Sequence, residues 1–291
     1  MSLGVVFVVL MIVAVFFVLV NPFKTNTGPT PPQPPNSATL SLQVTVPSSA
    51  LYGSQVDVKE IASSQGQPAL NPKLTLTVSL GNSTIYTTSQ PIDLTSTSTQ
   101  HYTVTLIDQN SVIQPSVGTA TLQSTLSADN GKTVLNSTSI QLWKPSATLN
   151  VNLPNSCVLG VCMPYSTPPL SAGTYLFKDA SVQYTGIQPG TFQVAVGVVL
   201  DQQTTPYFQM NSKLAQSFND NGKTIWIVSS DAIDSAHPIW KVPLDPTEFK
   251  VSTGGIPKAT INFDIVLYLI VGNGHYLPLF TIHETLQINQ S

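Results

Sequence analysis

Two Gly-Lys-Thr triplets, residues 131–133 and 222–224, are the first candidates for a functional site in this 291-residue chain, because such a triplet can bind phosphate. Each triplet has the last three positions of a phosphate-binding loop, which also needs a glycine five positions before the Gly-Lys pair. Those positions hold Leu126 and Ser217. Both triplets follow Asp-Asn, and Asn-Gly is a strong signal for a two-residue hairpin. We therefore predict turns here and no phosphate site.

Four histidines are the other candidates: His101, His237, His275 and His283. A nucleophilic site needs a serine or cysteine positioned beside a base, and no Gly-x-Ser-x-Gly motif occurs. His275 and His283 are expected on the solvent face of one strand, with Thr281, Thr285 and Gln287. The expected core face of that strand carries Tyr276, Phe280, Ile282, Leu286 and Ile288. Glu284 falls on this apolar face, where it is either a rim residue or a buried, functional acid.

The two cysteines, Cys157 and Cys162, enclose four residues. This spacing suits a small loop closed by a disulfide, which an oxidising exterior would preserve. A metal site would need further ligands, and no other cysteine or histidine lies nearby in the sequence. We predict a disulfide, and no catalytic, cofactor or metal site.

Three Asn-x-Ser/Thr sequons begin at Asn82, Asn136 and Asn289. Asn82 falls in a predicted turn and is the best acceptor of the three. Asn136 lies inside a predicted strand, and Asn289 is near the end of the chain.

Only 9% of the residues are charged, and arginine is absent. Proteins usually bind the phosphates of nucleic acids through the bidentate guanidinium group of arginine. We therefore predict that nucleic acid is not a partner. The polarity comes from Ser, Thr, Asn and Gln, whose side chains do not change when carboxylates are protonated in acid. An acidic external medium would explain this composition; a Ser/Thr-rich β-protein surface is the simpler alternative.

The N-terminal residues 3–20 are uncharged and apolar, which predicts a transmembrane anchor helix. No small-residue cleavage pattern follows, so a retained anchor is favoured over a signal peptide. Six prolines fall in residues 21–36, which predicts an extended stalk of roughly 50 Å at ~3.1 Å per residue. The disulfide and the sequons place the C-terminal part outside the membrane.

From Ala38 onward the hydrophobic residues alternate with polar ones, as in Leu74, Leu76, Val78 and Leu80. About seven strands are predicted in a first β-sandwich domain, residues 37–145, which suggests an immunoglobulin-like fold. These predicted strands are 40–46, 55–61, 74–80, 83–88, 102–106, 117–126 and 133–143.

A second, jelly-roll-like or elaborated sandwich is predicted for residues 146–291. Its predicted strands are 148–153, 174–185, 191–200, 223–230, 247–251, 259–271 and 275–288. The apolar run 265–271 is expected to be buried on both faces. Ser-Ala-Thr-Leu opens both regions, at Ser37 and Ser146, and both regions end in an Asn-Gly hairpin, which suggests two related sandwiches.

The hydrophobic anchor, proline-rich spacer and tandem Thr/Ser-rich sandwiches with few charges resemble membrane-anchored surface or virion proteins of hyperthermophilic, acid-dwelling archaea. The resemblance covers the whole chain but rests on architecture, so it assigns no functional residue. It implies a non-enzymatic structural or adhesive protein that projects two β-domains from a cell envelope or virion membrane. Its expected partners are the membrane, through residues 3–20, and other structural proteins, and we expect an oligomer.

Two alternatives stay open. One is a pilin-like filament subunit with residues 3–20 in the filament core. The other is a carbohydrate- or ligand-binding ectodomain, for which Trp226 and Trp240 are the only hints.

Overall fold

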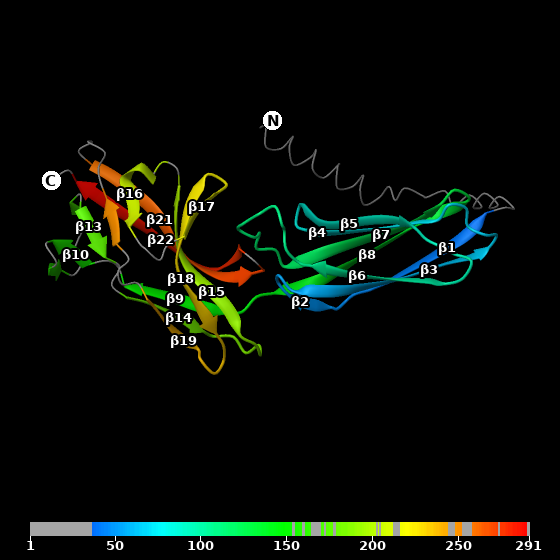
Figure 1. The fold of residues 1–291 in the computed structure, drawn as a ribbon, viewed down its shortest axis with the longest axis horizontal. Coiled ribbons are helices and arrows are strands. Elements are labelled where there is room, and N and C mark those ends of the chain that lie inside the picture. Colours follow the sequence, from blue (N-terminus) through cyan, green and yellow to red (C-terminus); the bar gives the residue numbers. More distant parts are fainter. Residues whose placement is uncertain are drawn as a thin grey trace, which may run out of the picture.

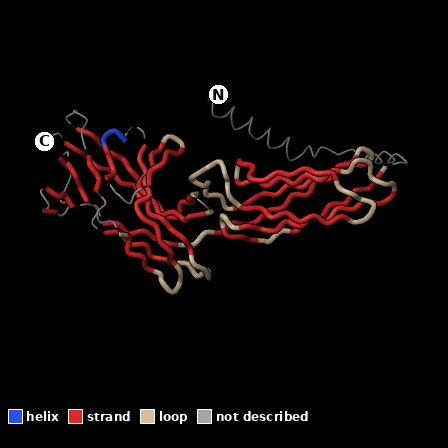
Figure 2. Tube along the Cα trace, in the orientation of Figure 1, coloured by secondary structure: helices blue, strands red, loops and turns tan. Residues whose placement is uncertain are grey.

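The computed structural model describes residues 37–291 except for short gaps. These gaps are 153–154, 159–160, 164–169, 172, 177–178, 202, 204, 212–215, 244–247, 252–257, 273 and 290–291. The predicted anchor and stalk lie outside the described residues. In the described part the fold is all-β, as predicted, with one short 3-10 helix at Thr205–Tyr207 (Figure 2). No helix within that part has the length and hydrophobicity needed to cross a bilayer.

The first region is a sandwich of two antiparallel layers (Figure 1). One layer has the strand order β5-β4-β7-β8 and the other has the order β1-β3-β6. They meet at one edge through a parallel bridge from Ala38 to Gly131, and the short strand β2 runs parallel to β8. The strands are β1 (Ala38–Thr45), β2 (Ser49–Leu51), β3 (Gln55–Gly66), β4 (Lys73–Leu80), β5 (Ser83–Pro91), β6 (Ser98–Thr105), β7 (Thr119–Ala128) and β8 (Gly131–Trp143).

Alternation of side chains explains why these residues form a sandwich. On β4, Leu74, Leu76, Val78 and Leu80 are fully buried, whereas the threonines between them are half-exposed. Successive residues of a strand point to opposite faces, so the apolar set of each strand meets that of the facing layer. The seven strands predicted for this region are all present, and β2, with three residues, is the one that the pattern missed.

The second region repeats this strand order with insertions. β9-β14-β19 corresponds to β1-β3-β6, and β18-β15-β21-β22 corresponds to β5-β4-β7-β8. The inserted segments form the sheet β11-β10-β13-β20-β16 and the strand β17, which pairs with the outer edge of β18. The first six bounds are β9 (Ala147–Asn152), β10 (Asn155–Val158), β11 (Val161–Met163), β12 (Leu170–Ser171), β13 (Gly173–Leu176) and β14 (Asp179–Tyr184). The remaining bounds are β15 (Phe192–Asp201), β16 (Phe208–Asn211), β17 (Gln216–Asp220), β18 (Lys223–Ile233), β19 (Ile239–Val242), β20 (Glu248–Val251), β21 (Lys258–Val271) and β22 (His275–Asn289).

The predicted single strand 174–185 is wrong. β13 pairs with β20, whereas β14 pairs with β9 and β19, so this segment divides between two sheets. The division depends on pairing with β20 on one side and with β9 and β19 on the other. These strands are distant in the sequence, so the local apolar pattern of residues 174–185 cannot predict it.

Strand β21 is buried on both faces over most of its apolar run, as predicted. Ile265, Leu267 and Leu269 belong to the main core, and Val266 and Tyr268 belong to a second cluster on the other face. That second cluster is covered by Phe218 of β17 and Tyr276 of β22, whose rings stack 5.6 Å apart. The sheet is therefore curved strongly enough for residues of β17 and β22, on either side of β21, to contact each other over one face of β21.

The prediction that His275 and His283 share a solvent face is wrong. A β-bulge between Leu267 and Tyr268 shifts the register of β22, so the alternation changes phase between the two histidines. His283 is exposed, whereas His275 lies half-buried opposite Val271. Phe280, expected in the core, is 38% exposed, although it pairs with the buried Leu267.

The two regions share one hydrophobic core. A single buried cluster runs from Tyr52, Leu106 and Ile107 of the first region to Val271 and Leu277 of the second. Gly53 sits at this junction with φ +82°, and a Cβ built on it would lie 2.7 Å from the Cβ of Val271. Glycine is therefore needed here both for its backbone angle and for close approach.

Gly53→Ala and Gly274→Ala form a matched test of this junction. Both glycines have φ near +80°, but a Cβ on Gly274 would have nothing within 4 Å. We expect each substitution to lower the free energy of unfolding by about 1–2 kcal/mol, because alanine is strained in the left-handed backbone conformation. Gly53→Ala should lower it by a further ~1–3 kcal/mol, because the added methyl group overpacks against Val271. Chemical denaturation measures both, and equal losses would show that the Gly53–Val271 contact does not constrain the junction.

Candidate functional site

The most elaborate polar arrangement in the described part is the junction between the two regions. The loop between β6 and β7, residues 106–118, adds to the start of β22 as a short parallel segment, with Ile113 bridged to Tyr276. The amide of Gln114 donates to the carbonyl of Tyr276 at 2.8 Å, and the amide of Tyr276 donates to the carbonyl of Val112 at 2.8 Å. The loop thus satisfies backbone groups of β22 that would otherwise lack partners at a buried edge.

The side chain of Gln114 holds this loop in shape. It is 1% exposed, and its Oε1 accepts from the amide of Asp108 at 2.8 Å. Its Nε2 donates to the carbonyls of Asp108 and Ser111, at 2.8 and 2.5 Å. The Ser111 carbonyl also accepts a hydrogen bond from Nδ1 of His275, at 2.8 Å. One buried amide therefore connects the loop of the first sandwich to the hairpin of the second.

Two further side chains complete the junction. The hydroxyl of Tyr52 donates to the carbonyl of Pro115 at 2.9 Å, and burial, with a smaller contribution from Asp108, raises the pKa of Tyr52 to about 12. Nζ of Lys144 donates to the carbonyl of Pro278, across the two regions, at 3.0 Å. Tyr52 therefore keeps its hydroxyl proton, and its hydrogen bond to Pro115, between acidic and neutral pH.

A buried carboxyl group, Glu60, lies inside the first sandwich. It is fully buried on β3 and accepts a hydrogen bond from the hydroxyl of Ser124 on β7. Its second oxygen has no hydrogen-bond partner of normal geometry, although the hydroxyl of Tyr102 is a polar neighbour. Burial raises the pKa of Glu60, opposed by Ser124 and Tyr102. The residue follows Val56 and Val58 at alternate positions of β3, a signal that could have placed it inside from the sequence.

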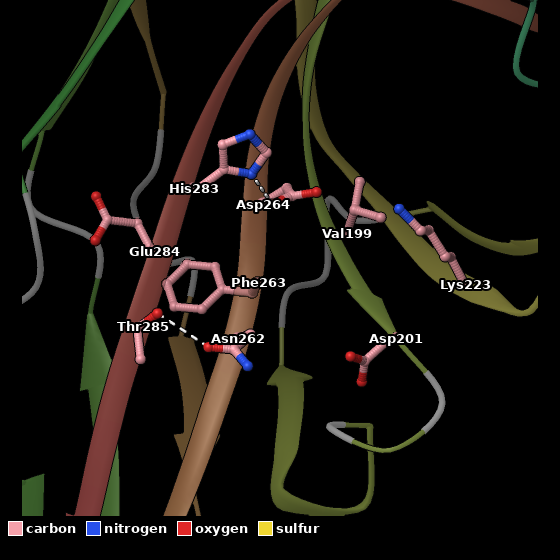
Figure 3. A pocket seen from close by; sticks show the side chains of 9 residues that line it. All are labelled: Val199, Asp201, Lys223, Asn262, Phe263, Asp264, His283, Glu284 and Thr285. Carbon is pink, nitrogen blue, oxygen red and sulfur yellow. Dashed lines mark hydrogen bonds and ion pairs between the residues drawn. The ribbon is translucent and has the colours of Figure 1, made fainter. Parts of the chain in front are cut away.

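A groove of about 310 Å³ lies where β21, β22, β15 and β18 meet (Figure 3). Nδ1 of His283 is 2.6 Å from a carboxylate oxygen of Asp264, and the hydroxyl of Thr285 donates to Asn262 at 2.9 Å. Asp201 and Lys223 face the groove from paired positions on β15 and β18. Glu284 lies at the same groove, half-buried, and burial raises its pKa.

The groove has a histidine–carboxylate pair but no serine or cysteine among its described lining residues. The one hydroxyl there, on Thr285, is engaged with Asn262. The histidine side chain is 80% exposed, so water competes for the pair, which contributes little to stability. Among the described residues no three His, Cys, Asp or Glu side chains gather in a way that could hold a metal ion.

The remaining histidines and the two tryptophans do not add to a site. His101 is exposed on β6, and His237 pairs with Asp234 at 3.3 Å in a surface loop. Trp240 is 7% exposed, and Trp226 packs with its ring 6.5 Å from that of Phe208. Core packing therefore accounts for both tryptophans, and they form no exposed aromatic platform.

The two Gly-Lys-Thr triplets are hairpins, as predicted. Asp129 and Asn130 form the turn between β7 and β8, and Asn221 and Gly222, both with positive φ, form the turn between β17 and β18. The amide of Leu70 donates to the side chain of Asn130 at 2.8 Å, so this turn is also tied to the loop before β4.

The cysteines face each other in the backbone register, since Cys157 of β10 pairs with Cys162 of β11. Their side chains lie outside the described residues, and the disulfide stays a prediction. Asn82 is exposed in the turn between β4 and β5. Nδ2 of Asn136, the atom to which a glycan would attach, donates to the carbonyl of Leu42 at 3.3 Å. The side chain of Asn289 is outside the described residues.

Comparisons with known proteins give no family. No protein-family model matches the chain, and no curated protein matches it. Among solved structures, a beta-glucosidase from Listeria innocua has a TM-score of 0.27 at 8% identity and covers 36% of this chain and 16% of its own. A trypsin-activated alpha-2-macroglobulin from Escherichia coli has a TM-score of 0.26 at 10% identity and covers 87% of this chain and 18% of its own. The chain spans less than a fifth of either protein, and neither likeness assigns a family or an activity.

Glu60→Gln tests the consequence of the buried carboxyl group. Because its pKa in the folded state is raised, Glu60 contributes most to stability below its unfolded pKa of about 4.3, and this contribution is lost as the pH rises through the folded value. Asp93 and Asp234, whose pKa values are lowered by hydrogen bonds, act in the opposite direction in both chains. We therefore expect the difference in melting temperature, native minus Glu60→Gln, to rise on acidification from pH 7 towards pH 4, because the pH slope that Glu60 contributes is missing in the variant. Asp57→Asn, on an exposed position of the same strand, is the control. An unchanged slope in Glu60→Gln would show that Glu60 is not the source.

Gln114→Ala tests the junction loop. Each buried donor or acceptor left without a partner costs about 1–3 kcal/mol, so a loss in at least this range is expected in chemical denaturation. Residues 106–118 should also become sensitive to limited proteolysis. Gln109→Ala, exposed in the same loop, should stay within ~0.5 kcal/mol of the native chain. If the two variants behaved alike, the amide network would not be what holds the loop.

Proposed function

We propose that this protein is a membrane-anchored structural protein of a cell envelope or virion surface, on which it holds two β-sandwiches at a fixed distance. Residues 3–20 form the anchor, residues 21–36 form the stalk, and the C-terminal sandwiches lie outside. The observation that carries the proposal is the junction. Its shared core and the Gln114 network make the two sandwiches one continuous body, as a projecting spacer requires.

The strand order supports the finer assignment of the fold. A three-stranded layer of the first, second and fifth major strands faces a four-stranded layer of the third, fourth, sixth and seventh. This Greek-key arrangement suits an immunoglobulin-like sandwich. The same order in β9–β22 supports a second, elaborated copy, and Ser37 and Ser146 precede equivalent first strands. We infer a tandem arrangement of residues 37–145 and 146–291.

The low charge supports an external, acidic setting. The first layer, β5-β4-β7-β8, presents threonine, serine and glutamine to solvent over most of its outer face, such as Thr77, Thr87, Thr121, Gln123 and Ser139. These side chains keep their hydrogen-bonding capacity at any pH, and the buried Glu60 favours its neutral form. A surface of this kind stays unchanged where carboxylates are protonated.

Membrane recovery of the full chain tests the proposal. We expect the native protein to remain in membranes after a carbonate wash and to be digested by protease added from outside. A double variant, Leu10→Lys and Val13→Lys, should be washed off, because a charged residue at the centre of a membrane helix costs about 2.5–3.5 kcal/mol. Ser2→Lys, just outside the apolar segment, should behave like the native chain.

Other outcomes decide between the alternatives. Recovery in filaments that sediment without lipid would replace the proposal with the pilin-like subunit. Co-purification with intact virus particles would select the virion surface over the cell envelope. Quantitative release of the native chain by carbonate would overturn the anchored role.

A further inference from the structure

The first sandwich has two strands, β5 and β6, that each end a layer with a free edge. In the described part, β5 pairs only with β4, and β6 pairs only with β3. The unpaired amides and carbonyls of such an edge form a template for another strand. Proteins usually protect an edge with lysine, proline or a covering segment.

Neither strand carries that protection. β5, Ser83–Pro91, has no charged residue, and its one proline is the last residue of the strand. β6, Ser98–Thr105, has one histidine, His101, and no lysine, arginine, aspartate or glutamate. The two strands have nine and eight residues, so their edges are of matched length.

The second sandwich shows that the equivalent edge accepts a strand. β18 takes the place there that β5 takes in the first sandwich, and β17 pairs antiparallel with its outer edge from Gln216 to Asp220. The first sandwich has no counterpart of β17 in the described part of the chain. The fold therefore supports a fifth antiparallel strand at this position, and in the first sandwich the position is open.

The two free edges lie on the same side of the sandwich. Nε2 of Gln90 on β5 donates to Gln100 and to the hydroxyl of Tyr102 on β6, at 3.2 and 3.1 Å. The rings of Tyr86 and Tyr102 are 6.4 Å apart. These inward contacts order both strands before any partner arrives, so little conformational entropy remains to be lost on pairing.

The directions of the strands decide which pairing is compatible with two identical chains. Following the antiparallel and parallel pairings around the sheet shows that β5 and β6 run in opposite directions. Both run along the length of the first region (Figure 1). A two-fold axis along that length would set β5 of one chain antiparallel to β6 of the other, and this contact would form twice. The interface is then closed and leaves no free edge on that side.

We propose that the chain forms a two-fold dimer in which β5 and β6 of the first sandwich pair with β6 and β5 of a second copy. A foreign strand fits these edges less well, because such peptides are selected by pockets or charges along the groove. The outward side chains here are mostly hydroxyls, and they already form a ladder from β4 to β5: Thr75 to Ser89 at 2.6 Å and Thr77 to Thr87 at 3.4 Å. Thr99 and Thr103 of β6 would continue this ladder across the dimer.

The pairing stands on the sheet edges alone, but its axis also suits the proposed function. Rotation about the length of the sandwich leaves both copies of Ala38, where β1 begins, at the same end. The two stalks would then approach one membrane together. Antiparallel pairing of β5 with another β5 would place them at opposite ends.

Cysteine cross-linking of the full chain in detergent tests the interface directly. Single variants Thr87→Cys on β5 and Thr99→Cys, His101→Cys or Thr103→Cys on β6 would be mixed in pairs and oxidised. We expect a β5–β6 pair to give a covalent dimer. Gln123→Cys, exposed at the centre of the same layer on β7, should give none with any partner and controls for the native cysteines. Dimers formed equally well with Gln123→Cys, or by no β5–β6 pair, would overturn the proposal.

Proline substitution gives a second test that does not depend on the register. Adjacent residues of an edge strand direct their amides alternately to the neighbour and to the free edge. Of Thr87→Pro and Thr88→Pro, one should therefore keep the β4 ladder and a melting temperature closer to that of the native chain. That variant should dimerise at least about ten-fold more weakly in sedimentation or mass photometry, which corresponds to about one lost hydrogen bond.

The failures of the two proposals can be told apart. A chain that dimerises through β5 and β6 but is washed from membranes would retain this interface and lose the anchored role. A membrane-retained chain that stays monomeric at every concentration, with neither proline variant differing from native, would retain the anchored role and lose the interface.

Discussion

The pairing of buried backbone groups is the constraint on which the rest of this structure depends. With few charges available, the chain relies on sheet ladders and apolar burial, and each strand end that enters the core must find a partner. The junction shows how this is met. The loop after β6 supplies the missing backbone partners of Tyr276, and Gln114 supplies those of the loop itself. Two sandwiches joined in this way cannot hinge without exposing unsatisfied polar groups.

The repeated strand order explains where the second sandwich differs from the first. The framework β9-β14-β19 and β18-β15-β21-β22 repeats that of the first region, and the extra strands occur as insertions between framework strands. In the described part, three insertions contribute strands to the separate sheet β11-β10-β13-β20-β16. The insertion that provides β16 also provides β17, which covers the edge of β18 and brings Phe218 onto Tyr276. The insertions therefore close surfaces that the plain sandwich leaves open. That difference is the reason why β21 is buried on both faces, whereas β7, its counterpart, is buried on one.

The sequence predicts those features that depend on local periodicity. Leu74 to Leu80 identify a half-buried strand, residues 265–271 identify a strand buried on both faces, and both Asp-Asn-Gly turns are hairpins. Features that depend on distant partners could not be predicted. The bulge at Leu267 changed the face of His275, and the loop of Gln114 reaches a residue more than 160 positions away. Glu60 is intermediate, because the alternation of its strand is enough to indicate an inward side chain, whereas its partner Ser124 comes from a distant strand.

The absence of strong charges has opposite effects on stability and on assembly. Hydroxyl and amide side chains make a surface that is insensitive to pH. Burial raises the pKa of Glu60, so this buried carboxyl group destabilises the fold least where protons are abundant. The same composition removes the lysines that normally keep sheet edges apart. A chain of this kind must therefore cover its edges by other means. In the second sandwich the strand β17 covers the edge of β18, and the first has no equivalent in the described part. The uncovered edge of β5, beside that of β6, is therefore the place where we expect contact between copies. The low number of charged residues, rather than a specific recognition residue, thus links the stability of this fold to its assembly.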